Sequence, residues 1–178
     1  MPGSVFRRGE TVELRTIEEE DAAFLRDLIN EPRVRAGIAN RTPKNLADER
    51  EWVDLLGDDG EANFLVCVDG DPVEPVGLRR RHEPSWGVWS VGYMLVPAAW
   101  GNGHATDAVR ETAVYAFSER RAAKLFATVY ETNPASARVL EKAGVAEEAV
   151  LRGEAFVDGE RVDMVRYGLL ADEWEGRP

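Results

Sequence analysis

The chain has 178 residues, of which 44% are apolar, and its formal net charge is −11. This length and composition suit a single domain over residues 1–178. A surface this acidic repels phosphate backbones, which argues against nucleic acid as a partner, and no stretch approaches the roughly 18 apolar residues of a membrane span.

The first half of the chain alternates between strand and helix patterns. Residues 11–15 alternate as a strand does, and an acidic run at 18–21 opens a helix that Pro32 ends. The remaining elements predicted in this half are a helix from about Pro43 to Leu56 with Thr42 as its N-cap, strands at Asn63–Val68 and Pro75–Arg80 joined by a turn at Asp69–Pro72, and a strand at Gly87–Val96.

The second half begins with the clearest helix of the sequence. One face of this helix, made of Ala105, Ala108, Val109, Thr112, Ala113, Ala116 and Phe117, recurs at helical spacing. A strand at Leu125–Tyr130 and a short helix at Pro134–Ala143, closed by Gly144, come next. A hairpin of strands Ala149–Val157 and Arg161–Leu170 turns at Asp158–Gly159. This order favours one mixed α/β sheet flanked by helices.

The segment from Pro97 to Gly103 joins a strand to the long helix. Glycines at this position let the backbone approach a ligand, and the helix start presents unpaired N–H groups, so an anion such as pyrophosphate fits. Thr106 stands where a dinucleotide-binding fingerprint needs Gly or Ala, and a Walker lysine is absent. A hairpin turn is disfavoured because a helix follows. From this segment alone, a purely structural glycine turn stays open.

A second strand-to-helix junction runs from Tyr130 to Ser136. Asn133 suits the N-cap and Pro134 the first helical position, so a structural role explains Asn133 without any ligand. Ser136 is harder to explain, because a capping box prefers Glu or Gln at this position.

Four stretches in this order resemble the GCN5-related N-acetyltransferases (GNAT), and specifically the branch that acetylates ribosomal protein N-termini. They are Val91-Gly92-Tyr93-Met94-Leu95, Trp100 to Ala108, Asn133 to Gly144, and the hairpin with Leu151-Arg152, Asp158-Gly159 and Asp163. The resemblance implies the GNAT fold: one mixed, mostly antiparallel sheet of six to seven strands with about four flanking helices. Together the matches run from about residue 11 to 170, which is the expected core of the domain. The resemblance also implies acetyl-CoA as cofactor.

The resemblance further implies site residues. The expected cofactor contacts are backbone groups of Leu95 and Val96 on the pantetheine arm, the loop Trp100, Gly101, Asn102, Gly103, His104, Ala105 and Thr106 on the pyrophosphate, and Asn133 and Ser136 near the thioester. Ser136 is the candidate general acid, and Tyr93 and Glu131 complete the expected catalytic set. A backbone N–H near Leu95 would meet the oxyanion.

The general base is the uncertain part of this site. Ser90 stands where the family often has an acid. An α-amine is about 10% free base at neutral pH and needs little help, so a site without a strong base favours an α-amine acceptor or uses an ordered water. Glu131, His104 and Glu154 are the candidates for the base, in that order, and each is also explained as a solvated or capping side chain.

Other reactive residues have plain explanations. Cys67 lies in an apolar strand without a nearby His, which predicts a buried, inert thiol. His82 has no partner at metal-ligand spacing, so we expect no metal site. A lone cysteine and the absence of an apolar N-terminal run favour the cytoplasm.

The function that we expect is direct acetyl transfer from acetyl-CoA to a primary amine. The acceptor could be a protein N-terminus, an amino-acid-like molecule or a polyamine, and the acidic surface would attract cationic acceptors. Because the hairpin edge could pair with another chain, a homodimer is considered alongside a monomer. The alternatives are an acetyl-CoA-binding regulatory module with little turnover, which Ser90 favours, and a purely structural domain.

Overall fold

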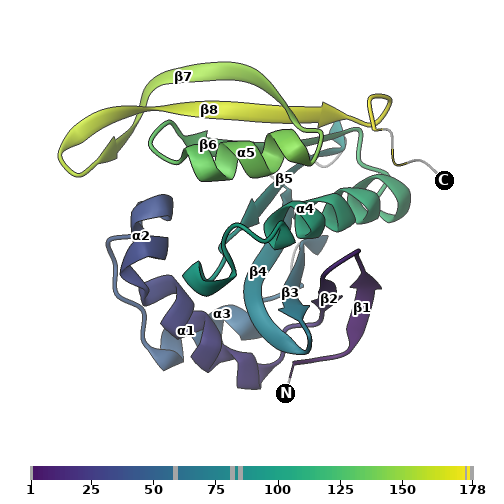
Figure 1. Ribbon diagram of the computed structural model, residues 1–178, viewed down its shortest axis with the longest axis vertical. Coiled ribbons are helices and arrows are strands. Elements are labelled where there is room, and N and C mark those ends of the chain that lie inside the picture. Colours follow the sequence, from purple (N-terminus) through teal and green to yellow (C-terminus); the bar gives the residue numbers. More distant parts are fainter. Residues whose placement is uncertain (1, 58–59, 81–82, 84–85, 175, 177–178) are drawn as a thin grey trace.

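The computed structural model describes residues 2–57, 60–80, 83, 86–174 and 176 (Figure 1). Eight strands form one sheet in the order β1-β2-β3-β4-β5-β6-β8-β7, in which only the β5–β6 pair is parallel. The strands are β1 Val5–Arg8, β2 Glu13–Arg15, β3 Ala62–Val68, β4 Asp71–Arg80, β5 Val88–Tyr93, β6 Lys124–Tyr130, β7 Ala146–Val157 and β8 Glu160–Leu170.

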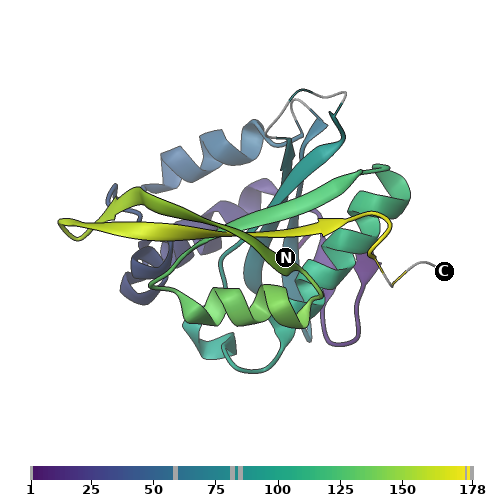
Figure 2. The same cartoon turned by 90° about the horizontal axis from the view of Figure 1, so that it is seen from above.

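Five α-helices in the described residues flank this sheet, on opposite sides as Figure 2 shows. They are α1 Ala22–Asn30, α2 Pro32–Ile38, α3 Leu46–Asp54, α4 His104–Val114 and α5 Pro134–Lys142, and a π-helical turn, Tyr115–Glu119, extends α4. The mixed, mostly antiparallel sheet is confirmed, with one strand and one helix more than expected. The additions are the short edge strand β1 and helix α2.

Two helix starts differ from the sequence prediction. Pro32 does close α1, but it also occupies the first turn of α2, where its missing N–H is harmless. Helix α3 starts at Leu46 instead of Pro43. Its N-cap is Asn45, whose side chain accepts from the Ala47 and Asp48 N–H groups at 2.7 and 3.2 Å, while Asp48 accepts from the Asn45 N–H.

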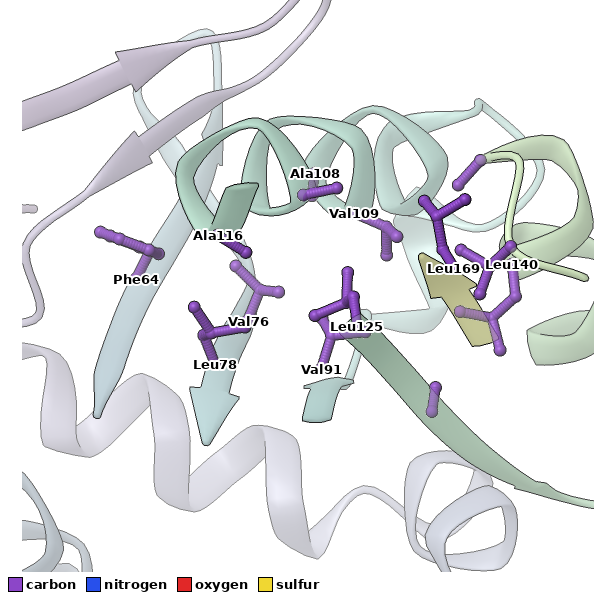
Figure 3. Close-up of a cluster of buried hydrophobic side chains, with 14 of the residues drawn as sticks. Phe64, Val76, Leu78, Val91, Ala108, Val109, Ala116, Leu125, Leu140 and Leu169 are labelled. Atoms are coloured by element: carbon purple, nitrogen blue, oxygen red, sulfur yellow. The ribbon is translucent and has the colours of Figure 1, made fainter. Parts of the chain in front are cut away.

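The core lies between the sheet and α4. Val76, Leu78, Val91 and Leu125 of the central strands point toward Ala108, Val109 and Ala116 of the helix, as Figure 3 shows, and all of these side chains are buried. The predicted apolar face of this helix is therefore confirmed. Small residues on that face let the helix approach the sheet closely enough to fix its N-terminus beside the end of β5.

Asp107 anchors the start of α4 to the far edge of the sheet. Its carboxylate accepts from the backbone N–H groups of Thr11 and Val12 at 2.6 and 3.2 Å, and from the Thr11 hydroxyl at 3.1 Å. The residue is buried, so these bonds replace its hydration. The anchor holds the helix start in one position relative to β2.

Glu74 is a fully buried acid on β4. Both of its carboxyl oxygens lack a hydrogen-bond partner among the described residues, and burial raises the pKa of this side chain from 4.5 to about 8. The strand's alternation places Glu74 on the same face as Val76 and Leu78. The carboxyl is therefore neutral in the folded protein at neutral pH.

This shift makes the stability of the protein depend on pH. Below pH 4.5 the side chain is protonated in both states, whereas between 4.5 and about 8 only the unfolded chain gives up the proton, so the folded state loses stability as pH rises. Glu74→Gln removes this titration. We compare the free energies of unfolding of this variant and the wild type by urea unfolding at each pH. The difference should shift in favour of the variant by on the order of 4 kcal/mol between pH 4.5 and 8, because only the wild type loses stability over this range. A constant difference across this range would contradict the assignment.

Candidate active site

The site begins where β5 and β6 separate. Their parallel pairing covers only Val88–Ser90 against Lys124–Phe126, although β6 continues to Tyr130 beside β8. Beyond Ser90, β5 remains attached to β4 alone. The sheet therefore opens on one side of β5, and two cavities occupy the opening.

The first cavity, of about 530 Å³, runs from the open strand end to the start of α4. Of the predicted cofactor residues it is lined by Leu95, Trp100, Gly101, Gly103, His104, Ala105, Thr106, Asn133 and Ser136. Val96 and Asn102 are not among its lining residues. The Val96 N–H donates to the Val73 carbonyl at 2.9 Å, and the Asn102 amide donates to the Ala99 carbonyl at 3.4 Å.

Backbone alternation along this stretch determines which N–H faces the opening. The N–H groups of Met94 and Val96 donate to β4, at the carbonyls of Pro75 and Val73. The N–H of Leu95, between them, therefore faces away from β4 and toward the splay. The Leu95 carbonyl accepts a hydrogen bond from the Trp100 indole N–H at 2.9 Å. This bond connects the loop before α4 to the end of β5.

The loop before α4 forms an anion cradle. Gly101 and Gly103 have φ values of 82° and 85°, a conformation that favours glycine, and Gly103 is the N-cap. The first intrahelical bond runs from the Asp107 N–H to the Gly103 carbonyl at 3.0 Å. The N–H groups from Gly103 to Thr106 precede that bond and lie at the positive end of the helix dipole. These residues fit a pyrophosphate group.

Three basic residues that sequence reasoning missed also line this cavity: Arg33 of α2, and Arg138 and Lys142 of α5. The Arg33 guanidinium lies 5.8 Å from the Trp100 ring centroid. Arg33 was overlooked because Pro32 was read only as a helix end. Together with the helix dipole, these cations make the cavity attractive to phosphate groups.

The second cavity, of about 620 Å³, lies on the other side of the splay. It meets the first at a junction formed by Gly37, Ile38, Tyr93, Met94, Asn133 and Ser136, which line both. Two ligands bound in these cavities would therefore touch at the junction. Sequence reasoning did not identify the second cavity, because its walls come from five strands and three helices that only tertiary pairing brings together.

Two hydroxyl groups meet at this junction. The Tyr93 hydroxyl lies 2.9 Å from the Ser136 hydroxyl and donates to the Ser136 carbonyl at 3.1 Å. Burial raises the pKa of Tyr93 far above its ordinary value and outweighs the lowering effect of its hydrogen bond to Ser136. The phenol therefore stays protonated and can donate a hydrogen bond.

Asn133 has two structural contacts. Its side-chain oxygen caps α5 by accepting from the Ser136 N–H at 3.2 Å, as the sequence predicted, and its amide donates to the Gly37 carbonyl of α2 at 3.2 Å. The second contact connects the helices on either side of the junction and so holds Ser136 opposite Tyr93.

The base candidates lie apart from the junction. Glu131 accepts from the Asp163 N–H at 2.7 Å, and its own N–H donates to the Asp163 carbonyl at 3.0 Å, which braces the strand end. The ring of His104 lies 3.3 Å from the Thr11 hydroxyl, and Glu154 is exposed on β7. Neither Glu131 nor Glu154 is among the residues that line the two cavities.

The remaining reactive residues show no catalytic arrangement. Cys67 is fully buried in β3, and burial raises its thiol pKa to about 11, so it stays protonated. Among the described residues, no group of three or more His, Cys, Asp or Glu side chains could hold a metal ion; His82 lies outside them. No helix in the described ranges is long and apolar enough to cross a membrane.

Comparison with known proteins agrees with this geometry. The sequence model of the acetyltransferase (GNAT) domain matches residues 11–146. The chain belongs to this family. The acetyltransferase is 29% identical to the "Putative ribosomal N-acetyltransferase YdaF" of Bacillus subtilis, over 94% of its own length and 95% of the relative. It is 25% identical to the spermidine N(1)-acetyltransferase of Escherichia coli strain K12, over 92% and 88%.

A solved structure extends the likeness to the fold. The spermidine N-acetyltransferase from Vibrio cholerae, in complex with CoA and spermine, superposes with a TM-score of 0.84 at 21% identity, covering 92% of this chain and 97% of that one. The protein is therefore an acyltransferase that uses acetyl-CoA and transfers acetyl to an amine.

The glycine at the start of α4 offers a test of the cradle. Gly103→Ala forces a side chain into a left-handed conformation, and we expect CoA to bind roughly tenfold more weakly as the N–H groups shift. Gly159→Ala is the matched control, because Gly159 has a φ of 89° and equally open surroundings, and it does not line either cavity. It should lose stability but keep its CoA affinity in calorimetric titration. Equal losses of affinity in both variants would argue against the cradle.

Proposed function

We propose that the protein transfers acetyl directly from acetyl-CoA to a primary amine, and that the amine enters from the second cavity. The observation that carries this proposal is the junction at Tyr93 and Ser136, where the two cavities meet. Direct transfer requires that the two reactants lie side by side. Direct transfer proceeds without a nucleophile that carries the acyl group. The buried, protonated thiol of Cys67 is therefore compatible with it.

We assign cofactor binding to the first cavity. Acetyl-CoA supplies an acetyl group already activated as a thioester. The N–H groups from Gly103 to Thr106 would hold its pyrophosphate, and Arg33, Arg138 and Lys142 would add positive charge for its phosphates. The Leu95 N–H would meet the negative charge that develops on the acetyl oxygen.

We assign proton donation to the Tyr93–Ser136 pair. One hydroxyl would protonate the departing thiolate while the other stabilises it by hydrogen bonding across the 2.9 Å contact. The raised pKa of Tyr93 keeps the phenol protonated at every physiological pH, so it enters the reaction as a hydrogen-bond donor. Glu131 takes a structural role in this proposal, because its carboxylate is already bonded to the Asp163 backbone.

The acceptor amine would lose its proton to solvent or to a water in the second cavity. An α-amine is about 10% free base at neutral pH, so this route suffices for a protein N-terminus or an amino-acid-like molecule. A polyamine is the other candidate, supported by the spermidine acetyltransferases among the relatives. The family membership disfavours the alternative that the sequence left open, a regulatory module that binds acetyl-CoA without turnover.

Measurement of free thiol separates these functions. We expect purified protein with acetyl-CoA and a pool of α-amines and polyamines to release CoA thiol well above the rate without amines. Tight CoA binding without release would favour the regulatory module. Absence of CoA binding in calorimetry would overturn the assignment of the first cavity.

Removal of either hydroxyl should slow the chemical step. We expect Tyr93→Phe and Ser136→Ala each to lower kcat by roughly 100-fold, with the KM for acetyl-CoA changed by less than about threefold. Tyr115→Phe and Ser118→Ala are matched controls, because neither residue lines a cavity, and both should retain activity. Equal losses in kcat and in CoA affinity would show that the pair only binds the cofactor.

A further inference from the structure

The second cavity differs in charge from the rest of the molecule. The protein carries a net charge of −11, yet the described residues that line this cavity include Arg79 and Arg166 and no Asp or Glu. The other lining side chains are apolar or neutral, among them Trp52, Tyr130 and Met164. A cationic ligand would find no opposite charge on these walls.

Arg166 of β8 is held in place without an ion-pair partner among the described residues. Its guanidinium lies 4.1 Å from the centroid of the Phe126 ring, a stacking contact that fixes the side chain over β6. Its Nε is buried and has no hydrogen-bond partner in the described part of the chain. An unpaired buried donor is costly, and the guanidinium as a whole lines the cavity without a counter-charge, so it matches a carboxylate ligand.

Arg79 approaches the same place from the opposite side of the opening. The register pairs Arg79 with Ser90, and Ser90 with Phe126, so these three residues form a row across β4, β5 and β6. The one ion pair of Arg79 among the described residues is a long contact of 3.8 Å with Glu61. Ser90, in the middle of the row, is neutral. Arg79 lies at one end of the row and the Arg166 guanidinium stacks on Phe126 at the other, so two guanidinium groups flank an uncharged centre.

The row lies some distance from the reacting hydroxyls. Ser90 precedes Tyr93 by three residues of extended strand, or about 10 Å along β5. If the amine of an acceptor reaches the junction, a group several ångströms away in the same acceptor molecule would lie near the arginines. The α-carboxylate of a free amino acid lies closest to its own amine, whereas the carboxylate of a Glu at a peptide's first position, or of an acidic second residue, extends further toward the arginines.

Resting on the proposed function, we infer that the acceptor is a peptide N-terminus with an acidic residue at its first or second position, and that Arg166 and Arg79 bind the carboxylate. Planar guanidinium groups match a carboxylate through paired hydrogen bonds, which a neutral amide does not reproduce. A polyamine would instead place a second positive charge beside the arginines. The same contacts therefore select an acidic peptide and reject spermidine.

Peptides that differ only in their first residue test this inference. We expect wild-type kcat/KM for a Glu-first peptide to exceed that for the Gln-first peptide by roughly tenfold or more, with Lys-first peptide and spermidine lower still. Arg166→Gln and Arg79→Gln should each lower kcat/KM for the Glu-first peptide toward that for the Gln-first peptide, and so remove the preference for Glu. Arg166→Lys should retain part of the preference, since it keeps the charge but loses the planar fork. Arg161→Gln, an exposed arginine elsewhere on β8, is the control and should keep the whole preference.

Binding of the same peptides to the CoA-loaded protein, measured by calorimetry, gives a readout that does not require turnover. Tighter binding of the Glu-first peptide without thiol release would retain this inference and overturn the proposed function. Turnover that is equal for Glu-first and Gln-first peptides, or fastest with spermidine, would overturn the inference and retain the function. Free glutamate acetylated as well as the peptide would keep the carboxylate contact and overturn the peptide acceptor.

Discussion

The early end of the single parallel strand pair is the constraint on which the site depends. Strand β5 pairs with β6 only as far as Ser90 and Phe126, and from there each strand follows its other neighbour. Backbone groups that a continuous ladder would have satisfied face an opening instead, and such groups need partners. The separation thus creates both cavities and supplies the Leu95 N–H at their edge. A sheet fully paired at this point would leave no space for two ligands to meet.

The position of α4 follows from the same opening. The helix covers the core with small side chains, and its start lies just beyond the free end of β5, where an anion can reach its N–H groups. Asp107, in the first turn, would place a negative charge near this anion if it faced the cavity. It is instead buried against the N–H groups of Thr11 and Val12. One carboxylate thereby fixes the helix to the sheet and is kept from opposing the ligand.

The sequence was informative where local chemistry decides the structure. The glycine loop, the cap at Asn133, the apolar face of α4 and the Asp158–Gly159 turn each depend on residues close in the chain, and the structure has each of them. Helix α2 was missed because a proline that ends one helix can equally begin the next. The arginines around the second cavity could not be grouped in advance. Arg79 and Arg166 lie on strands far apart in sequence, and only the register across β5 and β6 brings them to one place.

Two charge distributions act on an approaching acceptor, and they have opposite signs. The net negative surface acts over long range and attracts cations, but salt screens it beyond about 8 Å at physiological ionic strength. The arginines act at contact, inside a cavity where neighbouring side chains displace water and screening is weaker. Long-range attraction mainly changes the rate of encounter, whereas contact pairs decide which ligand stays bound.

The acidic surface is therefore a poor guide to the acceptor, and Ser90 is more informative. An acid at that position would pair with Arg79 and compete for it with an anionic ligand, whereas with a serine there the guanidinium keeps only the long Glu61 contact among the described residues.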